Sequence, residues 1–472
     1  MNSKPTPKPF AHQLVSIKHN DKAKLVLDLS DPGTGKTYVR IAGFAKRRAK
    51  GGGCLLVMAP RSLLRSVWFN DFKKFAPHLK VVIANADNRA EAFAEDADVY
   101  VTNVDAAKWL VIQKPAFFKK FNELVVDEST AYKHHTSQRS KAMAKVAKHF
   151  EYRCCMTGTP NSNTITDIWH QVQILDEGKR LGFSFFKFRD AVCTPTQVGR
   201  KAEMVKWHDK EGAEEAVFGL LSDIVVRHKF EDCVDIPANH QYPVDYDLTS
   251  KQLKTYLELE QTQMLSLSKS TMTAVNAAAV RTKLLQIASG AVYDGLGSFQ
   301  VVDRARYELV LDLVEQRKHS LVFFLWKHQR DMLVEEAEKR GINFCVLDGA
   351  TSDRDREEMV QGYQAGVYQA MFAHPKSAAH GLTLTKGTAT IWSSPTDDLE
   401  IFKQGSKRQH RMGQTEKTET IVVIAKGTFD EKVWDNMLSK GKRMDNLLDL
   451  FGTLTPVAAP VVVRKKKVME AA

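Results

Sequence analysis

The chain has 472 residues, too many for one ordinary hydrophobic core, so its length predicts two lobes. Hydrophobic content of 43% and charged content of 26% are typical of a soluble globular protein, and no apolar run approaches the roughly 20 residues of a membrane span. The net charge of +12 favours a polyanionic partner, and the alternative is a basic surface that only keeps the protein soluble.

The six cysteines form no CxxC pair and no His/Cys cluster. Neither a zinc site nor a disulfide framework is therefore indicated. The first ten residues carry charge and proline but no apolar stretch of the secretory type. These features predict the cytoplasm as the location and no membrane as a partner.

Short apolar runs alternate with helical segments in the first half of the chain. Residues 25–29 form a run that ends at a glycine-rich segment, and a helix is expected from Lys36 to Lys50. A helical pattern also covers 62–75. Further strands are expected at 54–59, 81–84, 99–102, 123–126 and 153–156. This alternation predicts an α/β fold with a parallel sheet covered on both faces.

The segment Ser30–Thr37 fits a phosphate-binding loop, except that Ser30 stands where the first glycine is expected. Its glycines permit backbone N–H groups to turn inward and form a nest for phosphate oxygens. Lys36 supplies a charge to the β- and γ-phosphates, and the Thr37 hydroxyl is a Mg²⁺ ligand. The alternative is a glycine-rich turn with a chance lysine. The predicted nucleotide-binding residues are Gln13, Asp31, Pro32, Gly33, Thr34, Gly35, Lys36 and Thr37.

Two carboxylates, Asp127 and Glu128, follow an apolar strand directly. Their expected work is to hold Mg²⁺ through Asp127 and to take a proton from the attacking water through Glu128. Such pairs also cap helices, which is the alternative. Upstream, the Gln13 amide is expected to read adenine, although a lone glutamine is more often an ordinary surface residue.

The second half of the chain repeats the alternation after a break. Residues 161–235 have helical character and are expected as an insertion on a first lobe, 1–235. Strands at 321–325, 344–347, 370–373, 389–392 and 420–424 predict a second sheet, in a lobe at 236–450 with a helical insertion at about 245–300. Thr428 and Glu431 have capping-box spacing for a final helix. The basic segment 451–472 is expected to be a flexible tail.

The segment Gln404–Gln414 contains Arg408 and Arg411, three positions apart. On a helix or tight turn these arginines face the same way. Arginine side chains stabilise the charge that develops on a transferring γ-phosphoryl group. A solvated basic stretch is the alternative, and the glycine-rich loop favours the catalytic interpretation.

This ordered set resembles the superfamily 2 helicases, and more closely the switch/sucrose-non-fermenting (SNF) family of double-stranded-DNA translocases. The ending Arg411–Gln414 resembles the Arg-x-Gly-Gln of that family, and the compact chain with His380–Leu382 resembles its bacteriophage and prophage branch. Ser129-Thr130 and Thr383 depart from the family pattern. The matching segments are Gln13, 31–37, 59–64 with Trp68 and Phe72, 102–103, 127–130, 157–160, 380–385, 404–414 and 427–431.

The resemblance implies two RecA-like lobes in tandem, with ATP bound in the cleft between them and Mg²⁺ as cofactor. Its catalytic residues are Lys36, Asp127, Glu128, Gln404, Arg408 and Arg411, with Thr37 and Asp127 on the metal. Contacts to the DNA backbone are implied for Arg61, Ser62, Thr102, Asn103, Ser377 and Thr385. A strand-end turn is the alternative interpretation of Thr102-Asn103.

The expected activity is ATP hydrolysis coupled to movement along double-stranded DNA, by a chain expected to be monomeric. Replication or recombination proteins are further expected partners. Two alternatives stay open. One is a helicase that unwinds RNA or single-stranded DNA, and the other is a nucleotide-gated DNA clamp with little turnover.

Overall fold

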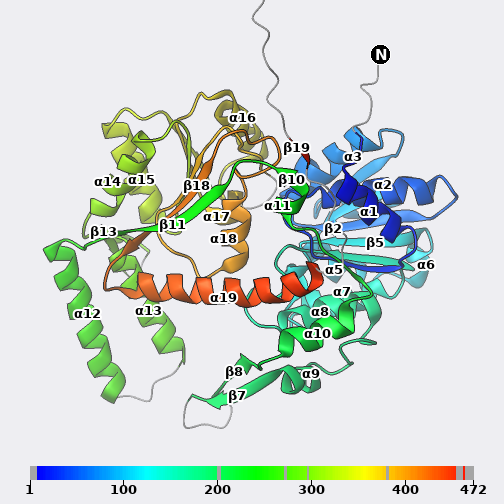
Figure 1. Cartoon of the computed structure of the whole chain (residues 1–472), viewed down its shortest axis with the longest axis horizontal. Helices are drawn as coiled ribbons and strands as arrows, with labels where there is room; N and C mark the ends of the chain where they lie inside the picture. The colour runs from blue at the N-terminus through cyan, green and yellow to red at the C-terminus, as the bar shows by residue number, and fades with distance from the viewer. Residues whose placement is uncertain are drawn as a thin grey trace, which may run out of the picture. The chain divides into compact units, whose positions relative to one another are not determined.

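The computed structural model describes residues 8–198, 204–269, 274–294, 297–378, 382–452 and 461–462. These residues form two compact units (Figure 1). Unit 1 comprises 8–235 together with 440–452 and 461–462, and unit 2 comprises 236–439. Within the described ranges, no helix has both the length and the apolar character needed to cross a membrane.

Unit 1 is built on a seven-stranded sheet in the order β3-β4-β2-β5-β6-β1-β9, with every pair parallel. Helices cover both of its faces, which is why its strands read as continuous apolar runs (Figure 1). The strands are β1 (Leu25–Asp28), β2 (Cys54–Ala59), β3 (Val81–Ala84), β4 (Val99–Asn103), β5 (Phe121–Asp127), β6 (Tyr152–Met156) and β9 (Val225–Val226).

The helices of unit 1 are mostly short. Where one helix was expected over 62–75, a π-helical turn η1 (Leu64–Phe69) precedes α3. The other helical elements are α1 (Ala11–Asn20), α2 (Lys36–Arg48), α3 (Asn70–Phe75), α4 (Arg89–Ala94), η2 (Val104–Ala106), α5 (Ala107–Leu110), α6 (Pro115–Phe118), η3 (Ser129–Tyr132), α7 (Gln138–Ala147), α8 (Asp167–Asp176), α9 (Phe185–Val192), α10 (Ala213–Leu221) and α11 (Phe230–Cys233).

The sequence led us to expect a helical insertion at 161–235, but this segment is not purely helical. It also contains an antiparallel hairpin of β7 (Cys193–Gln197) and β8 (Val205–Asp209). Its strand β9 joins the main sheet beside β1, because Leu27 and Asp28 pair with Val225 and Val226. The end of this segment is therefore part of the unit 1 core. A further parallel pair joins β10 (Val234–Asp235) to β19 (Val461–Val462).

Unit 2 is built on a six-stranded parallel sheet in the order β11-β18-β17-β14-β16-β15. Figure 1 shows α14 and α15 on one side of β18, with α17 and α18 on the other. This second parallel sheet confirms the predicted α/β class with two sheet-based lobes. The strands are β11 (Asn239–Tyr246), β14 (Ser320–Phe323), β15 (Phe344–Leu347), β16 (Ala370–Ala373), β17 (Ala389–Trp392) and β18 (Thr418–Ala425).

The expected helical insertion of unit 2 consists of α12 and α13, followed by a hairpin of β12 (Ala291–Tyr293) and β13 (Phe299–Val301). The helices of unit 2 are α12 (Ser250–Lys269), α13 (Ala274–Ala288), α14 (Ala305–Glu315), α15 (Lys327–Lys339), α16 (Asp353–Ala365), α17 (Pro375–Ala378), α18 (Leu399–Ser406) and the first part of α19 (Phe429–Gly452).

The predicted second lobe ended at residue 450, but unit 2 ends at Ser439. The last turns of α19 belong to the core of unit 1, where Phe451 is fully buried and its ring lies 5.5 Å from that of Phe218. Asp449 also pairs with Lys229 at 2.9 Å. Apolar packing against α10 thus assigns this end of the helix to unit 1. Apart from Phe451, Gly452 and β19, the predicted tail 451–472 lies outside the described residues.

The start of α19 is held by its expected cap. The Thr428 hydroxyl accepts the Asp430 N–H at 3.2 Å, and Glu431 reaches one residue further back than a capping box requires, to the Gly427 N–H at 3.1 Å.

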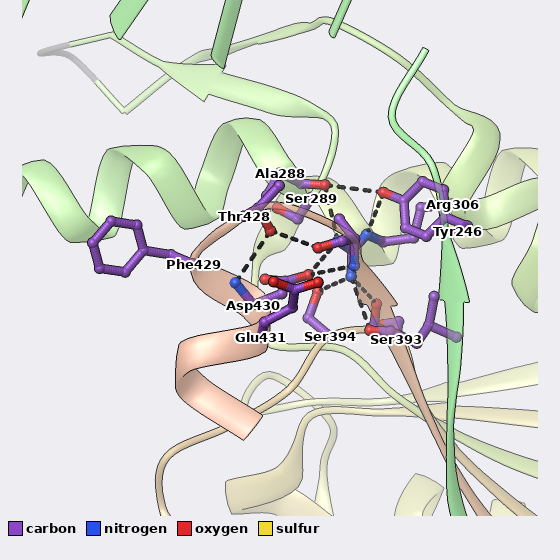
Figure 2. A network of polar contacts seen from close by, with 12 residues as sticks. Tyr246, Ala288, Ser289, Arg306, Ser393, Ser394, Thr428, Phe429, Asp430 and Glu431 are labelled. Carbon is purple, nitrogen blue, oxygen red and sulfur yellow. Dashed lines mark hydrogen bonds and ion pairs between the residues drawn. The ribbon is translucent and has the colours of Figure 1, made fainter. Parts of the chain in front are cut away.

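A buried arginine, Arg306 of α14, joins several chain segments of unit 2 (Figure 2). Its side chain is 1% exposed and forms an ion pair with Asp430 at 2.5 Å. The remaining N–H groups donate to Tyr246 Oη at 3.0 Å, Ala288 O at 2.9 Å, Ser393 O at 2.8 Å, Ser394 Oγ at 2.9 Å and Val423 O at 3.3 Å. One guanidinium thus ties the ends of β11, β17 and β18 to the start of α19.

Replacing Arg306 by methionine is expected to lower the free energy of unfolding by about 3–5 kcal/mol, because the buried Asp430 carboxylate loses its charged partner. The double variant Arg306→Met/Asp430→Asn should recover part of that loss, since no unpaired charge remains. Urea denaturation followed by circular dichroism measures both. Arg354→Met, which breaks an exposed pair with Glu358, is the control and should cost less than about 1 kcal/mol. Equal losses in the two single variants would contradict this account of Arg306.

Candidate functional site

The glycine-rich loop lies between β1 and α2 of unit 1, as the sequence predicts. Gly33 has φ +92° and Gly35 has φ +83°, a left-handed backbone that disfavours side chains. Neighbours also fill the space beside each glycine. A Cβ on Gly35 would lie 2.2 Å from Gln13 Nε2, and one on Gly33 would lie 3.0 Å from the Phe230 ring. Only glycine satisfies both the backbone and the packing at these positions.

Lys36 is the first residue of α2, and its ammonium group lies over the loop. Nζ donates to Ser30 O at 2.6 Å and to Asp31 O at 3.2 Å. A helix N-terminus with a lysine above the preceding loop is a site suited to phosphate. The serine that replaces the expected glycine has a structural role, because Ser30 Oγ accepts the His228 N–H at 3.2 Å.

A segment that the sequence analysis missed runs along this loop, from Arg227 to Phe230. Arg227 pairs with Asp31 at 2.5 Å and donates to Leu29 O at 2.9 Å. The other Asp31 oxygen accepts the Phe230 N–H at 2.9 Å. Asp31 is thereby fixed from two directions. No short sequence motif could have predicted this ion pair, because the arginine and the aspartate are 196 positions apart.

Gln13 is buried against the loop and is not an ordinary surface glutamine, being 5% exposed. Its amide donates to Thr34 O at 3.2 Å, and its amide oxygen accepts the Phe10 N–H at 3.0 Å. His12 Nε2 also lies 2.8 Å from Thr34 O. These contacts connect α1 with the glycine-rich loop, so Gln13 touches the loop backbone directly.

Asp127 ends β5 and is buried, with Oδ2 accepting the Trp68 indole N–H at 2.9 Å and Oδ1 accepting the Glu128 N–H at 3.1 Å. Burial raises the pKa of the Asp127 carboxyl, against the hydrogen bond from Trp68 and the positive charge of Lys36. Glu128 has φ +49°, a strained position for a non-glycine residue that recurs at functional sites. The Trp68 contact was not expected for a residue noted only as part of a family motif.

A second buried carboxylate, Asp28, lies at the same edge of the sheet. Asp28 and Asp127 both pair in register with Met156 of β6, so two strand spacings, about 10 Å, separate them. Burial raises the pKa of Asp28, but the charges of Arg40 and Lys36 outweigh burial and lower it. Asp28 is occupied by its ion pair with Arg40 at 3.0 Å.

This donor set fits Mg²⁺. Magnesium takes oxygen ligands and keeps several waters, so one or two protein groups with substrate phosphates suffice. Thr37 offers a hydroxyl at the start of α2. Asp127 offers a carboxylate, and a bound cation would offset the cost of keeping its charge buried. Among the described residues, no group of three or more His, Cys, Asp or Glu forms an all-protein metal site.

Ser129, where the sequence departs from the family pattern, links two predicted motifs. Its buried hydroxyl donates to Gln171 Oε1 at 2.7 Å. The Gln171 amide donates in turn to Pro160 O at 2.8 Å, at the end of the 157–160 motif. The hydroxyl therefore connects the segment after Glu128 to the loop after β6.

In unit 2, the predicted arginines converge on one carbonyl. Arg408 Nη1 donates to Leu382 O at 3.3 Å, and Arg411 Nη1 donates to the same oxygen at 2.5 Å. They therefore face the same way, as expected. They differ in exposure, because Arg408 is 5% exposed and donates to Gln404 O at 2.7 Å, whereas Arg411 is partly exposed. The buried Gln404 Oε1 has no hydrogen-bond partner in the described part of the chain.

The predicted DNA contacts of unit 1 have different environments. Arg61 is exposed and Ser62 is partly exposed, immediately after β2. Thr102 is fully buried, and its hydroxyl donates to Ala84 O at 2.6 Å. Both faces of the sheet are covered, so this side chain points into the core, and we withdraw it as a phosphate contact. Asn103 is partly exposed and accepts a hydrogen bond from Arg89 at 2.9 Å.

In unit 2, Ser377 and Thr385 are both partly exposed. The Ser377 carbonyl accepts a hydrogen bond from Arg356, and the Thr385 hydroxyl accepts one from Gln364 at 3.3 Å. The His380-Gly381 part of the predicted motif lies outside the described residues.

Comparison with known proteins agrees with this geometry. Residues 12–289 match the SNF2-related domain, and residues 305–413 match the helicase conserved C-terminal domain. The chain belongs to the SNF2-related family. This SNF2-related chain is an ATP-hydrolysing enzyme of the helicase type, as the sequence predicts.

Its relatives include a phage protein, which agrees with the predicted phage branch. A putative protein of Acyrthosiphon pisum secondary endosymbiont phage 1 is 28% identical over 94% of this chain and 98% of its own length. An uncharacterized ATP-dependent helicase of Mycoplasma genitalium is 25% identical over 80% of this chain, which spans 36% of that helicase. A Sulfolobus solfataricus SWI2/SNF2 ATPase core, solved in complex with double-stranded DNA, is 20% identical, with 94% of this chain and 93% of that chain covered and a TM-score of 0.44.

The segment around the loop makes stability depend on pH. His228 is 7% exposed, its Nε2 lies 2.7 Å from Ser16 Oγ, and burial lowers its pKa to about 4. The unfolded chain binds a proton below about pH 6.5, whereas folded His228 does not until about pH 4, so stability falls as the pH drops through that interval. Between pH 7 and pH 5, this residue lowers the free energy of unfolding by at most about 2 kcal/mol.

His228→Gln is expected to reduce that acid-induced loss, because the variant lacks the imidazole at position 228, while the nearby His12, whose pKa burial also lowers, keeps its own share. Urea denaturation at pH 7 and pH 5 measures the loss in each variant. His78→Gln, at an exposed histidine, is the control and should behave as the wild type does. If His228→Gln shows the full wild-type loss, His228 is not the group responsible.

Proposed function

We propose that this enzyme couples ATP hydrolysis to movement along double-stranded DNA. The observation that carries the proposal is the glycine-rich loop at the end of β1, with Lys36 above it and Asp127 at the same edge of the sheet. A nucleoside triphosphate is the ligand that needs a phosphate nest, a lysine and a metal-binding carboxylate together.

In this proposal, the inward N–H groups of the loop and Lys36 bind the β- and γ-phosphates, and the Gln13 amide reads adenine. Thr37 and Asp127 would hold Mg²⁺, which neutralises phosphate charge when it is bound. Glu128 accepts the proton of the attacking water. Its left-handed backbone turns the chain sharply after Asp127, so that neighbouring carboxylates serve different roles.

We further propose that Gln404, Arg408 and Arg411 of unit 2 complete the site around the same ATP. Arg411, the more exposed arginine, acts as the finger on the γ-phosphate, and the buried Arg408 holds the segment in place. Hydrolysis would then remove the contact that favours closure and allow the units to reopen. Repeated closure moves such an enzyme along a polymer.

Arg61, Ser62, Asn103, Ser377 and Thr385 are proposed as contacts to the DNA backbone. Such contacts follow phosphates and carry little sequence information. The Arg-Met-Gly-Gln ending favours duplex DNA over RNA or single strands, and the net charge of +12 suits any of these polyanions. The cytoplasm, that of the host for a phage protein, is the proposed setting, and the monomer is the proposed form.

The first test is the steady-state ATPase rate with duplex DNA, single-stranded DNA or RNA, each at two salt concentrations. Duplex is expected to stimulate most, and the stimulation should fade steeply with salt because binding to DNA releases counterions. Lys36→Ala, which removes the charge above the loop, is the negative control. Stimulation by single strands or RNA alone would indicate an unwinding helicase, and tight binding without stimulation would indicate a clamp.

Arg411→Ala is expected to slow duplex-stimulated turnover by about 10³-fold or more while ATP binding stays nearly intact, because a finger acts mainly on the transition state. Binding is measured with a fluorescent ATP analogue, and turnover by phosphate release. Lys417→Ala removes one exposed positive charge close to the same segment and is the matched control. Near-normal turnover by Arg411→Ala would contradict the proposed two-unit mechanism.

A further inference from the structure

Unit 1 contains a basic groove of about 630 Å³ that none of the predicted nucleotide or DNA contacts lines. It lies among α5, α7 and α8, and α7 contacts both of the other helices. Three lysines line it, Lys108 from α5 and Lys141 and Lys145 from α7. None of the groove-lining residues, all of them described, is a carboxylate. We refer to this feature as the α7 groove.

The charge of the α7 groove is uncompensated. Lys141 and Lys145 are four positions apart on α7, so two like charges share one face and repel each other. Within the described ranges, no ion pair engages them or Lys108. Burial lowers the pKa of the neighbouring His135, and the charges of Lys141, His134 and Arg189 lower it further. Every charge that shifts this pKa is thus positive, which suits an anionic ligand.

Aromatic rings continue the α7 groove onto α9. The His135 ring stacks on Phe185 at 3.8 Å, and Trp169, which also lines the groove, meets Phe185 edge-on at 5.6 Å. Phe186 lies 6.2 Å from His135 and is 60% exposed. An exposed phenylalanine beside a groove marks a contact surface more often than an isolated surface apolar residue does.

The run of rings ends in a cation. The Arg189 guanidinium lies 5.3 Å from the Phe186 ring centre and 3.6 Å from that of Trp207 on β8. Within the groove, the buried His170 is 4% exposed, and its Nδ1 has no hydrogen-bond partner in the described part of the chain. The surface therefore offers lysines, a stacked arginine, aromatic faces and a polar ring atom without a partner.

We propose that the α7 groove and the adjoining Phe186 surface bind single-stranded nucleic acid, as a site separate from the predicted duplex contacts. The lysines would contact successive phosphates, and the exposed ring would stack on an unpaired base. Proteins that hold single strands without reading sequence combine these two elements. A duplex presents phosphates but no base faces, so exposed aromatic rings favour the single strand. Binding here does not require ATP turnover.

The test measures binding of a fluorescent oligothymidine of about 20 nucleotides and of a duplex of the same length to the full chain, without ATP, over a salt series. Lys141→Glu/Lys145→Glu should weaken oligothymidine binding by about tenfold or more. The slope of log association constant against log salt concentration should become less steep by about 1.4, which corresponds to the loss of two phosphate contacts. Affinity for duplex and duplex-stimulated ATPase should stay within about twofold of wild type, which also reports that the variant is folded.

Lys254→Glu/Lys339→Glu makes the same change of net charge at exposed lysines of unit 2 and is the matched control. It separates a local effect of the groove from a general effect of charge. If this control weakens oligothymidine binding as much as the groove variant does, the proposed site is wrong.

Phe186→Ala tests the stacking contact and leaves the charge unchanged. We expect about 5- to 100-fold weaker binding of oligothymidine and an unchanged salt slope. Val367→Ala, at an apolar residue of unit 2 that is 54% exposed, is the matched control. Equal loss of duplex and oligothymidine binding in the groove variants would assign the groove to the duplex path. Competition by polyglutamate together with a silent Phe186→Ala would assign it to an acidic protein segment, and either result overturns the proposal.

Discussion

The site in unit 1 depends on how closely three distant segments approach the glycine-rich loop. A Cβ on Gly35 would meet the Gln13 amide, one on Gly33 would meet Phe230, and one on Gly158 would lie 2.9 Å from Pro32. The loop backbone is therefore held from α1, from the turn after β6 and from the segment after β9. A phosphate nest needs N–H groups that already point inward, and this packing fixes their direction before any ligand arrives.

Buried carboxylates at the end of the sheet show how one environment supports two roles. Asp28 and Asp127 lie on either side of Met156 in register. Arg40 neutralises Asp28 and lowers its pKa, so Asp28 helps to fix α2 against β1. Asp127 accepts hydrogen bonds from an indole and a backbone N–H, and its pKa is raised by burial. A carboxylate in that state gains most from a cation, which supports the proposal that Mg²⁺ binds at Asp127 and not at Asp28.

The sequence predicted most strands within a residue or two, because strands buried on both faces read as uninterrupted apolar runs. It placed Lys36, Thr37 and Asp127 at the ends of the correct elements, since those residues follow local patterns. It failed where a contact joins distant segments, as between Arg227 and Asp31. Thr102 was misjudged for a related reason: in a strand covered on both faces, alternation does not tell which side chains reach solvent. The strand β9 was missed because two valines are too short a run to distinguish from a helix end.

The two arginines of unit 2 illustrate why such a segment needs more than one cation. In the proposed mechanism, Arg411 meets a phosphate only in the transition state, and a long side chain loses rotamer entropy each time it does so. Arg408 is buried with its donors on Gln404 O and Leu382 O, so it fixes the backbone on which Arg411 stands. Gln414 adds hydrogen bonds to Thr385 O and Gly387 O, which hold the segment against the turn that precedes β17. With the backbone fixed, only the outer part of the Arg411 side chain would remain to be ordered, so the proposed approach to the phosphate would cost correspondingly less entropy.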